Sequence, residues 1–213
     1  MKIRCISLAF ILAALLITVG CAYNKTIEGF DAIEWFEMGR QASFDNSLDK
    51  ALDAFNKAIE LDPKIAEAYI NRGRTHYYLG NYNQAVADYN KAIELDPKDS
   101  ETYINRGRTY YYLGNYNQAV ADYNKVIELN PRNTHAYVSR GDAYVKLGKH
   151  KQAVVDYDKA IELNVEFALA YYKRGLAYSA FGNHNQAIAD WKIAARLGLE
   201  EAQNYLIRQG IVW

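Results

Sequence analysis

The sequence has few prolines, few cysteines and no excess of charge of either sign. With only three prolines and 50% hydrophobic residues, a disordered chain is excluded and a packed core is favoured. The 25 basic and 25 acidic residues balance, which leaves no basic face for a nucleic-acid partner. Of the two cysteines, Cys5 lies in an N-terminal segment that we expect to be removed, so Cys21 has no disulfide partner.

Long hydrophobic runs are also absent, except for residues 8–19 near the N-terminus. This run carries no charge and follows the basic residues Lys2 and Arg4. At about a dozen residues, it is shorter than the roughly 20 that a membrane-spanning helix needs. The segment ends as Thr18-Val19-Gly20-Cys21, and this pattern resembles a bacterial lipoprotein signal.

The resemblance implies that residues 1–20 are a signal peptide and that cleavage leaves Cys21 as a lipidated N-terminus. Residues 21–31 would then link the lipid to the folded part of an exported, membrane-anchored lipoprotein. In a bacterium with two membranes, Ala22 after the modified cysteine implies the periplasmic face of the outer membrane. Two alternatives stay open, an ordinary cleaved signal and a signal that is retained as an anchor.

The rest of the chain repeats with a fixed period of 34 residues and no insertion or deletion. Residues 69–98 and 103–132 are identical at 26 of 30 positions. One glycine marks the same position of every repeat, at Gly39, Gly73, Gly107, Gly141 and Gly175. The period defines five repeats, at residues 32–65, 66–99, 100–133, 134–167 and 168–201.

Within a repeat, the residue spacing predicts two helices. Tyr69, Gly73 and His76 follow the i, i+4, i+7 spacing of one helical face, and residues 85–92 repeat it on a second helix. Asp–Pro or Asn–Pro steps end the second helix in repeats 1 to 3, because proline disfavours helix in the residue before it. Since one such hairpin cannot bury its apolar face alone, neighbouring hairpins must stack.

The turn between the two helices has its own signals. Gly80, between Leu79 and Asn81, is expected to end the first helix, and Asn83 is the expected N-cap of the second. Repeat 1 has Asn46 at the position of this glycine, and asparagine also tolerates a left-handed backbone.

The five glycines inside the first helices need a different explanation. Each costs about 1 kcal/mol relative to alanine, so we expect a neighbouring helix to pass so closely that a β-carbon would collide. Small residues of the second helix, such as Ala85, are the expected partners, with aromatic residues such as Tyr89 filling the gaps on either side.

The combined pattern resembles the tetratricopeptide repeat (TPR) family. An aromatic residue stands four positions before each glycine, and the alanine and second aromatic positions follow in register. The resemblance covers residues 32–201 and implies an all-α fold, a right-handed α-solenoid of five TPR hairpins. Residues 202–213 are expected to form a C-terminal capping helix. The residues expected to cover repeat 5 are Tyr205, Leu206, Val212 and Trp213.

Two charged positions also recur with the period. Arg72 directly precedes the helical glycine, Asp88 follows sixteen residues later, and both recur in repeats 3 to 5. Repeat 1 lacks both charges and has Met38 and Ala54 instead. We therefore predict an Arg–Asp contact within or between repeats. The alternative is two independently solvated positions.

The sequence contains no recognisable catalytic constellation. His150 and His184 share a repeat position with tyrosines, and His76 replaces Tyr110, so these histidines are interpreted as structural. The acidic residues recur with the repeat, which indicates solvated helix faces rather than one acid/base pair. There is no metal-ligand spacing, phosphate-binding loop or nucleophile elbow. We expect a non-enzyme with no cofactor, no metal and no small-molecule substrate.

The TPR resemblance implies that the first helix of each hairpin lines a concave groove that receives a partner peptide. Asparagine amides can bond its backbone, arginine can hold a carboxylate, and tyrosine supplies rigid contact area. Alternatively, the tyrosines mainly pack against each other. The expected groove residues are Ile70, Asn71, Arg74, Tyr77, Tyr78, Ile104, Asn105, Arg108, Tyr111 and Tyr112.

The expected function is that of a scaffold or adaptor that docks a protein for envelope assembly, secretion or wall remodelling. A second hypothesis is a structural element that self-assembles by stacking through the solenoid ends. A third, from another class, is an enzyme subunit with a cryptic site.

Overall fold

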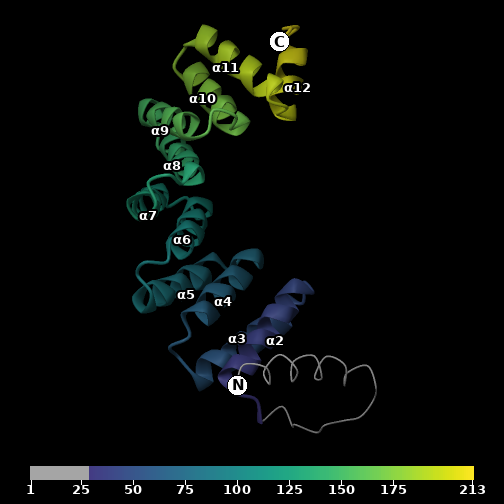
Figure 1. Cartoon of the computed structure of the whole chain (residues 1–213), viewed down its shortest axis with the longest axis vertical. Coiled ribbons are helices and arrows are strands. Elements are labelled where there is room, and N and C mark those ends of the chain that lie inside the picture. Colours follow the sequence, from purple (N-terminus) through teal and green to yellow (C-terminus); the bar gives the residue numbers. More distant parts are fainter. Residues whose placement is uncertain (1–28) are drawn as a thin grey trace, which may run out of the picture.

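The computed structural model describes residues 29–213 and arranges them as an elongated stack of helices, without a strand in this part of the chain (Figure 1). The expected signal, Cys21 and most of the linker lie outside the described residues. The helices are α2 (Ala32–Phe44), α3 (Leu48–Leu61), α4 (Ala66–Tyr78), α5 (Tyr82–Leu95), α6 (Ser100–Tyr112), α7 (Tyr116–Leu129), α8 (Thr134–Lys146), α9 (His150–Leu163), α10 (Ala168–Ala180), α11 (His184–Arg196) and α12 (Glu200–Arg208).

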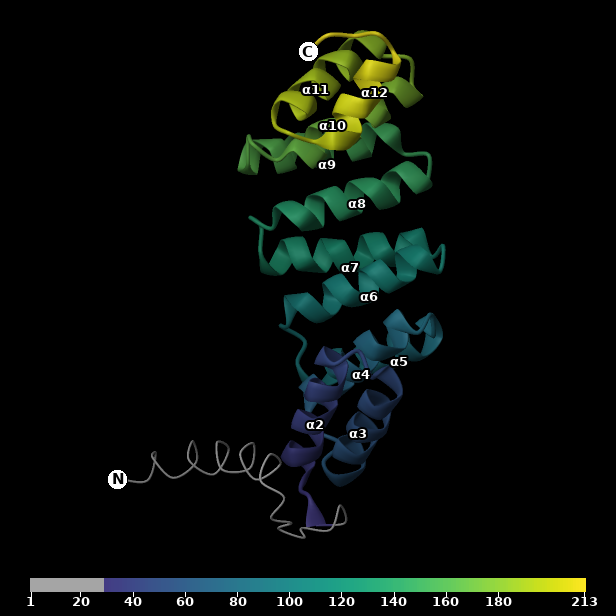
Figure 2. The ribbon, with the colours of Figure 1, turned by 90° about the vertical axis from the view of Figure 1, so that its right-hand side faces the viewer.

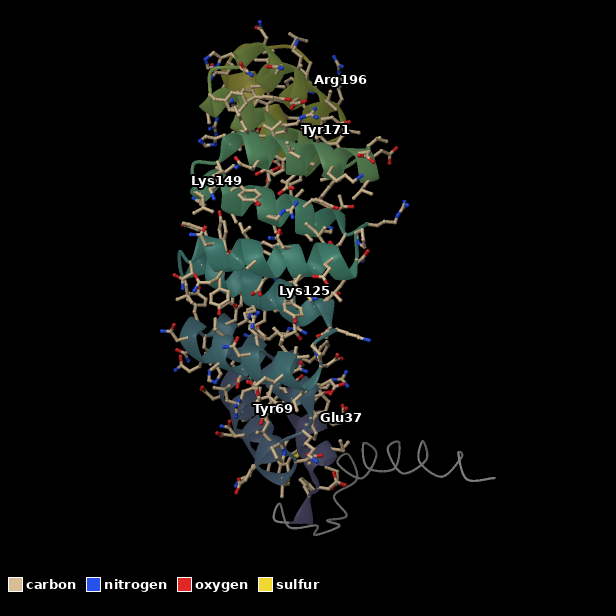
Figure 3. The ribbon with its side chains drawn as sticks, turned by 90° about the vertical axis from the view of Figure 1, so that its left-hand side faces the viewer. Glu37, Tyr69, Lys125, Lys149, Tyr171 and Arg196 are labelled. Atoms are coloured by element: carbon tan, nitrogen blue, oxygen red, sulfur yellow. The ribbon has the colours of Figure 1, made fainter. Side chains whose placement is uncertain are left out.

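Consecutive helices pair into five hairpins, from α2–α3 to α10–α11, and the second helix of each hairpin packs on the first helix of the next. Figure 2 shows these helices as successive layers that rise from α2 and α3 to α12. Tyr69 in α4 and Tyr171 in α10 occupy equivalent repeat positions and lie far apart along the stack (Figure 3). The expected α-solenoid is confirmed.

The turn inside each hairpin is short because one residue, a glycine in repeats 2 to 5, adopts a left-handed backbone there. Gly80 has a φ of 77°, and its N–H donates to the carbonyl of Tyr77 at 3.0 Å. The N–H of Asn81 donates to the carbonyl of His76 at 2.8 Å, which completes a Schellman motif at the end of α4. Asn46 has a φ of 55° at the equivalent position of repeat 1, as predicted.

The N-cap prediction for the second helix is wrong. Helix α5 already begins at Tyr82, so Asn81 holds the N-cap position and Asn83 lies inside the first turn. The Asn81 side chain makes no capping hydrogen bond. Because the Schellman motif reverses the chain within two residues, the second helix starts earlier than the capping preference alone suggests.

The helical glycines do mark close approaches, but the expected partner is wrong. A β-carbon on Gly39 would lie 2.5 Å from the ring of Phe55, and one on Gly141 would lie 2.7 Å from the ring of Tyr157. In every repeat, the nearest atom belongs to the aromatic residue of the second helix rather than to an alanine. The ring itself lies over the glycine and fills the space of its missing side chain.

Helix α12 closes the C-terminal end of the stack, as expected. Ala202 and Leu206 are fully buried there. The ring of Tyr205 lies 4.2 Å from that of Trp191, measured between centroids. The expectation for Val212 is wrong, because its side chain is 83% exposed. Its two neighbours, Ile211 and Trp213, pack against the end of the stack instead, and alternate residues of an extended tail point to opposite sides.

Candidate functional site

The recurring arginine and aspartate form an ion pair in repeats 2 to 5, in which the aspartate is buried and the arginine is partly buried. In repeat 2, Arg72 donates from Nε and Nη2 to the two carboxylate oxygens of Asp88, at 2.9 and 2.6 Å. Its Nη1 donates to Oδ1 of Asn56 in the preceding repeat, at 2.8 Å. One guanidinium therefore joins three helices, and the predicted contact is confirmed. The other pairs are Arg106–Asp122, Arg140–Asp156 and Arg174–Asp190.

Burial dominates the electrostatics of this pair. Desolvation raises the pKa of Asp122, and the hydrogen bonds and charge of Arg106 oppose that rise. The guanidinium carbon of Arg106 also lies 5.5 Å from the ring centroid of Tyr103, within the range of a cation–π contact. Since every polar atom of the pair is engaged inside the stack, the pair fixes the packing of the repeats and is not available to a ligand.

The first helices of neighbouring repeats contact each other, from α2 and α4 through to α8 and α10. This side of the stack carries three clefts of about 430, 360 and 400 Å³. The first lies between α2 and α4, the second between α4, α6 and α8, and the third beside α4 and the start of α6. Arg74 lines all three clefts. We refer to this continuous surface as the groove.

Most of the residues predicted for the groove come together in these clefts. Tyr111 and Tyr112 do not line them and lie instead in a group of tyrosine rings beside them. The residues that line at least one cleft are Ile70, Asn71, Arg74, Tyr77, Tyr78, Ile104, Asn105 and Arg108.

Repeat 1 contributes residues that the sequence reasoning missed. Arg40 and Phe44 of α2 line the first cleft, and the Phe44 side chain is 87% exposed. Arg40 occupies the same repeat position as Arg74 and Arg108, so the 34-residue period could have identified it. Phe44 occupies the same repeat position as Tyr78 and Tyr112, so the period could have identified it as well.

The group of tyrosine rings extends across repeats 2 and 3. The Tyr77 ring contacts the Tyr112 ring of the next repeat at 5.7 Å between centroids, and Tyr82 stacks on Tyr112 at 6.0 Å. Burial, followed by a hydrogen bond with Tyr112, raises the pKa of Tyr77 to about 12. The rings do pack against each other, yet Tyr78 and Tyr112 stay 66% and 59% exposed. The group therefore offers rigid aromatic surface next to the clefts.

Several polar groups in the groove have no partner within residues 29–213. The guanidinium groups of Arg74 and Arg108 make neither an ion pair nor a hydrogen bond there. The Nδ2 atom of Asn105 is buried and has no hydrogen-bond partner. In the equivalent Asn71, Nδ2 donates to the carbonyl of Glu67 at 2.8 Å. These donors without a protein partner lie in repeats 2 and 3.

The next repeat differs because the charge at the repeat position of Arg108 is already paired. Asp142 stands at the repeat position of Arg108, accepts a hydrogen bond from the Tyr157 hydroxyl at 2.8 Å and pairs with Lys173 at 2.8 Å. Lys173 comes from α10, so this ion pair joins the first helices of repeats 4 and 5. The unpaired charges therefore belong to the N-terminal half of the groove.

The described part of the chain offers neither a metal site nor a membrane-spanning helix. Among residues 29–213, no group of three histidine, cysteine, aspartate or glutamate side chains is placed to hold a metal ion. In that range, too, every helix is too short or too polar to cross a membrane.

Stacked helical hairpins with an inner groove define an α-solenoid repeat protein. The family model described as "TPR repeat" matches residues 45–80, 107–148 and 141–182. Two further models, described as "Tetratricopeptide repeat", match residues 66–99 and 88–121. The chain belongs to the tetratricopeptide repeat family.

Solved structures share this fold. A crystal structure of MamA is 27% identical, with a TM-score of 0.73 over 78% of this chain and 97% of that chain. YrrB, described as "a TPR protein with an unusual peptide-binding site", is 24% identical, with a TM-score of 0.73 over 86% and 97%. MamA from Desulfovibrio magneticus RS-1 is 20% identical, with a TM-score of 0.75 over 81% and 97%. No curated protein matches the chain.

Proposed function

We propose that this protein is a non-catalytic scaffold that binds an extended segment of a partner protein in the groove. One observation carries the proposal: the unpaired guanidinium groups of Arg74 and Arg108 share a cleft with the exposed ring of Tyr78. Arginine and tyrosine are enriched where protein interfaces gain most of their binding energy. The TPR fold supports an interaction scaffold, and the peptide-binding site named for YrrB supports a peptide as the ligand.

In this proposal, the protein works next to a membrane. Its sequence supports an exported lipoprotein that is attached through Cys21, on the periplasmic face of the outer membrane where the source has two membranes. Residues 22–31 extend at most about 35 Å, so the groove would stay close to the lipid surface. Docking of a partner there suits envelope assembly, secretion or wall remodelling. Stacking through the solenoid ends has less support, because α12 covers one of them.

The test is a crosslinking pulldown from native membranes with wild type and the variant Arg74→Ala, Tyr78→Ala, Arg108→Ala. The matched control is Lys91→Ala with Lys125→Ala, which also removes two positive charges but from helices α5 and α7, outside the clefts. Circular dichroism checks that each variant is folded.

We expect wild type and control to capture the same partner and the groove variant to lose it. Equal capture by all three proteins would move binding to the outer face or to α12 and contradict the proposal.

A further inference from the structure

The groove carries charges of both signs, and they lie along two separate edges. Glu67 and Arg74 are seven residues apart on α4, and Glu101 and Arg108 are seven residues apart on α6. Seven residues are two helical turns, so each pair shares one helix face with a separation of about 10 Å. The starts of the two helices therefore form an acidic edge, and the middles of the helices form a basic edge.

These opposite charges share clefts without pairing. Glu101 lines the second cleft together with Arg74 and Arg108, and it lines the third cleft together with Glu67 and Arg74. None of the four side chains forms an ion pair within residues 29–213. In repeat 4, by contrast, the Asp142–Lys173 pair removes its own charges from the groove. The charges of repeats 2 and 3 remain available to a ligand.

The acidic edge carries more negative charge than that of the two glutamates alone. Asp96 and Asp99 also line the third cleft, although both carboxylates accept backbone N–H groups of nearby residues. A uniformly acidic ligand would therefore meet repulsion along one side of the groove while it gains attraction along the other.

An amide lies between the two edges. Asn105 is four residues after Glu101 and three before Arg108, so it faces the same cleft from the same helix. Its buried Nδ2 atom has no hydrogen-bond partner, which is costly unless a ligand supplies an acceptor. The carbonyl groups of an extended peptide are suitable acceptors, and they recur along its whole length.

We infer that the groove selects an extended peptide whose side chains alternate between acidic and basic. Successive side chains of an extended chain point to opposite sides, so one set faces each edge. The acidic set would pair with Arg74 and Arg108, and the basic set with Glu67 and Glu101. This inference rests on the proposed function, because it assumes that the groove is the binding surface.

The first test measures fluorescence anisotropy with three labelled peptides of equal length. One alternates glutamate and lysine, the second glutamate and glutamine, and the third lysine and glutamine. We expect the first peptide to bind wild type at least tenfold more tightly than either of the others, and added salt to reduce the difference. Equal affinity for the glutamate–glutamine peptide would overturn the inference.

Variants assign each edge. Glu67→Gln with Glu101→Gln should remove the advantage of lysine, so the first two peptides bind equally. Arg74→Gln with Arg108→Gln should remove the advantage of glutamate, so the first and third peptides bind equally. The control Lys91→Gln with Lys125→Gln should leave the order of affinities unchanged, and a change there would contradict the assignment.

The two proposals fail in different ways. If wild type captures its partner through the groove but shows no preference among the peptides, the charge pattern is wrong and the scaffold function stands. If capture does not depend on the groove residues, the scaffold proposal and this inference both fall.

Discussion

Arg106 holds three helices together through one guanidinium group. It pairs with Asp122 inside its own hairpin and donates to Asn90 of the preceding repeat at 2.7 Å. Because each such arginine reaches back to its neighbour, the network both closes a hairpin and fixes how the next hairpin stacks on it. Repeat 1 has no preceding repeat, and Met38 and Ala54 take the places of the charged pair.

We predict that Arg106→Gln destabilises the fold by about 3 kcal/mol at neutral pH, because it leaves the buried carboxylate of Asp122 without its partner. Burial already raises the pKa of Asp122, and Arg106 opposes that rise. Without the guanidinium, the folded-state pKa rises further above the unfolded value of about 4. The folded chain then binds a proton that the unfolded chain has released, so the variant loses stability as pH rises from about 4 towards 7.

Urea unfolding of the variant at pH 4.5 and pH 7.5 measures this effect. The control is the double variant Arg106→Gln with Asp122→Asn, which removes the buried charge and should lose the added pH dependence. The same loss of stability at both pH values for the single variant would contradict the prediction.

A second prediction at the residue scale concerns Gly39. Gly39→Ala should destabilise repeat 1 by about 1–3 kcal/mol, although alanine is the better helix former, because its β-carbon would lie 2.5 Å from the buried Phe55 ring. The free energies of unfolding of Gly39→Ala, Phe55→Leu and the double variant measure it. The double variant should lose less stability than the sum of the single losses. Simple additivity would show that the ring is not the obstacle.

Helix α12 is the element that ends the stack. It packs on α11, and Leu206 is its largest fully buried side chain. Leu206→Ala should cost about 2–5 kcal/mol, because it leaves a cavity at the end of the core. The matched control is the adjacent Ile207→Ala, whose side chain is exposed and whose loss should change stability by less than about 0.5 kcal/mol.

Hydrogen exchange shows which helices lose stability in Leu206→Ala. Because each repeat contacts only its neighbours, faster exchange in Leu206→Ala should concentrate in α10, α11 and α12. Uniformly faster exchange along the chain would contradict a local capping role.

The sequence predicted the hairpins because their constraints are local. Gly80 and Asn46 mark left-handed turns, and the period shows where each turn recurs. The partner of Gly39 was not predictable in the same way. Both the alanine and the aromatic residue of the second helix recur with the period, and only the packing of the two helices places the ring over the glycine. For the groove, the 34-residue period identified which positions line it but not whether their charged side chains are paired. Whether an arginine is paired depends on side chains from other repeats, as Asp142 and Lys173 show.

At the scale of the whole molecule, the N-terminal segment and the repeats differ in composition, and Cys21 lies between them. Residues 8–19 are uncharged and apolar, whereas 23% of the entire chain is charged. We propose that the position of the protein in the cell depends on the chemistry at Cys21 rather than on the repeats. Lipidation, ordinary cleavage and a retained anchor make different demands on Cys21.

We predict that Cys21→Ser in the full chain moves the protein from the membrane fraction to the soluble fraction or leaves it as an uncleaved precursor. The physical reason is that serine has no thiol to carry the lipid, while the apolar run stays unchanged. Fractionation and intact mass of the purified protein measure the outcome, and wild type should carry added lipid mass. The control is Cys5→Ser, which lies in the segment that we expect to be removed and should change neither result. Membrane binding that survives Cys21→Ser, with no lipid mass on wild type, would show that residues 8–19 themselves anchor the protein.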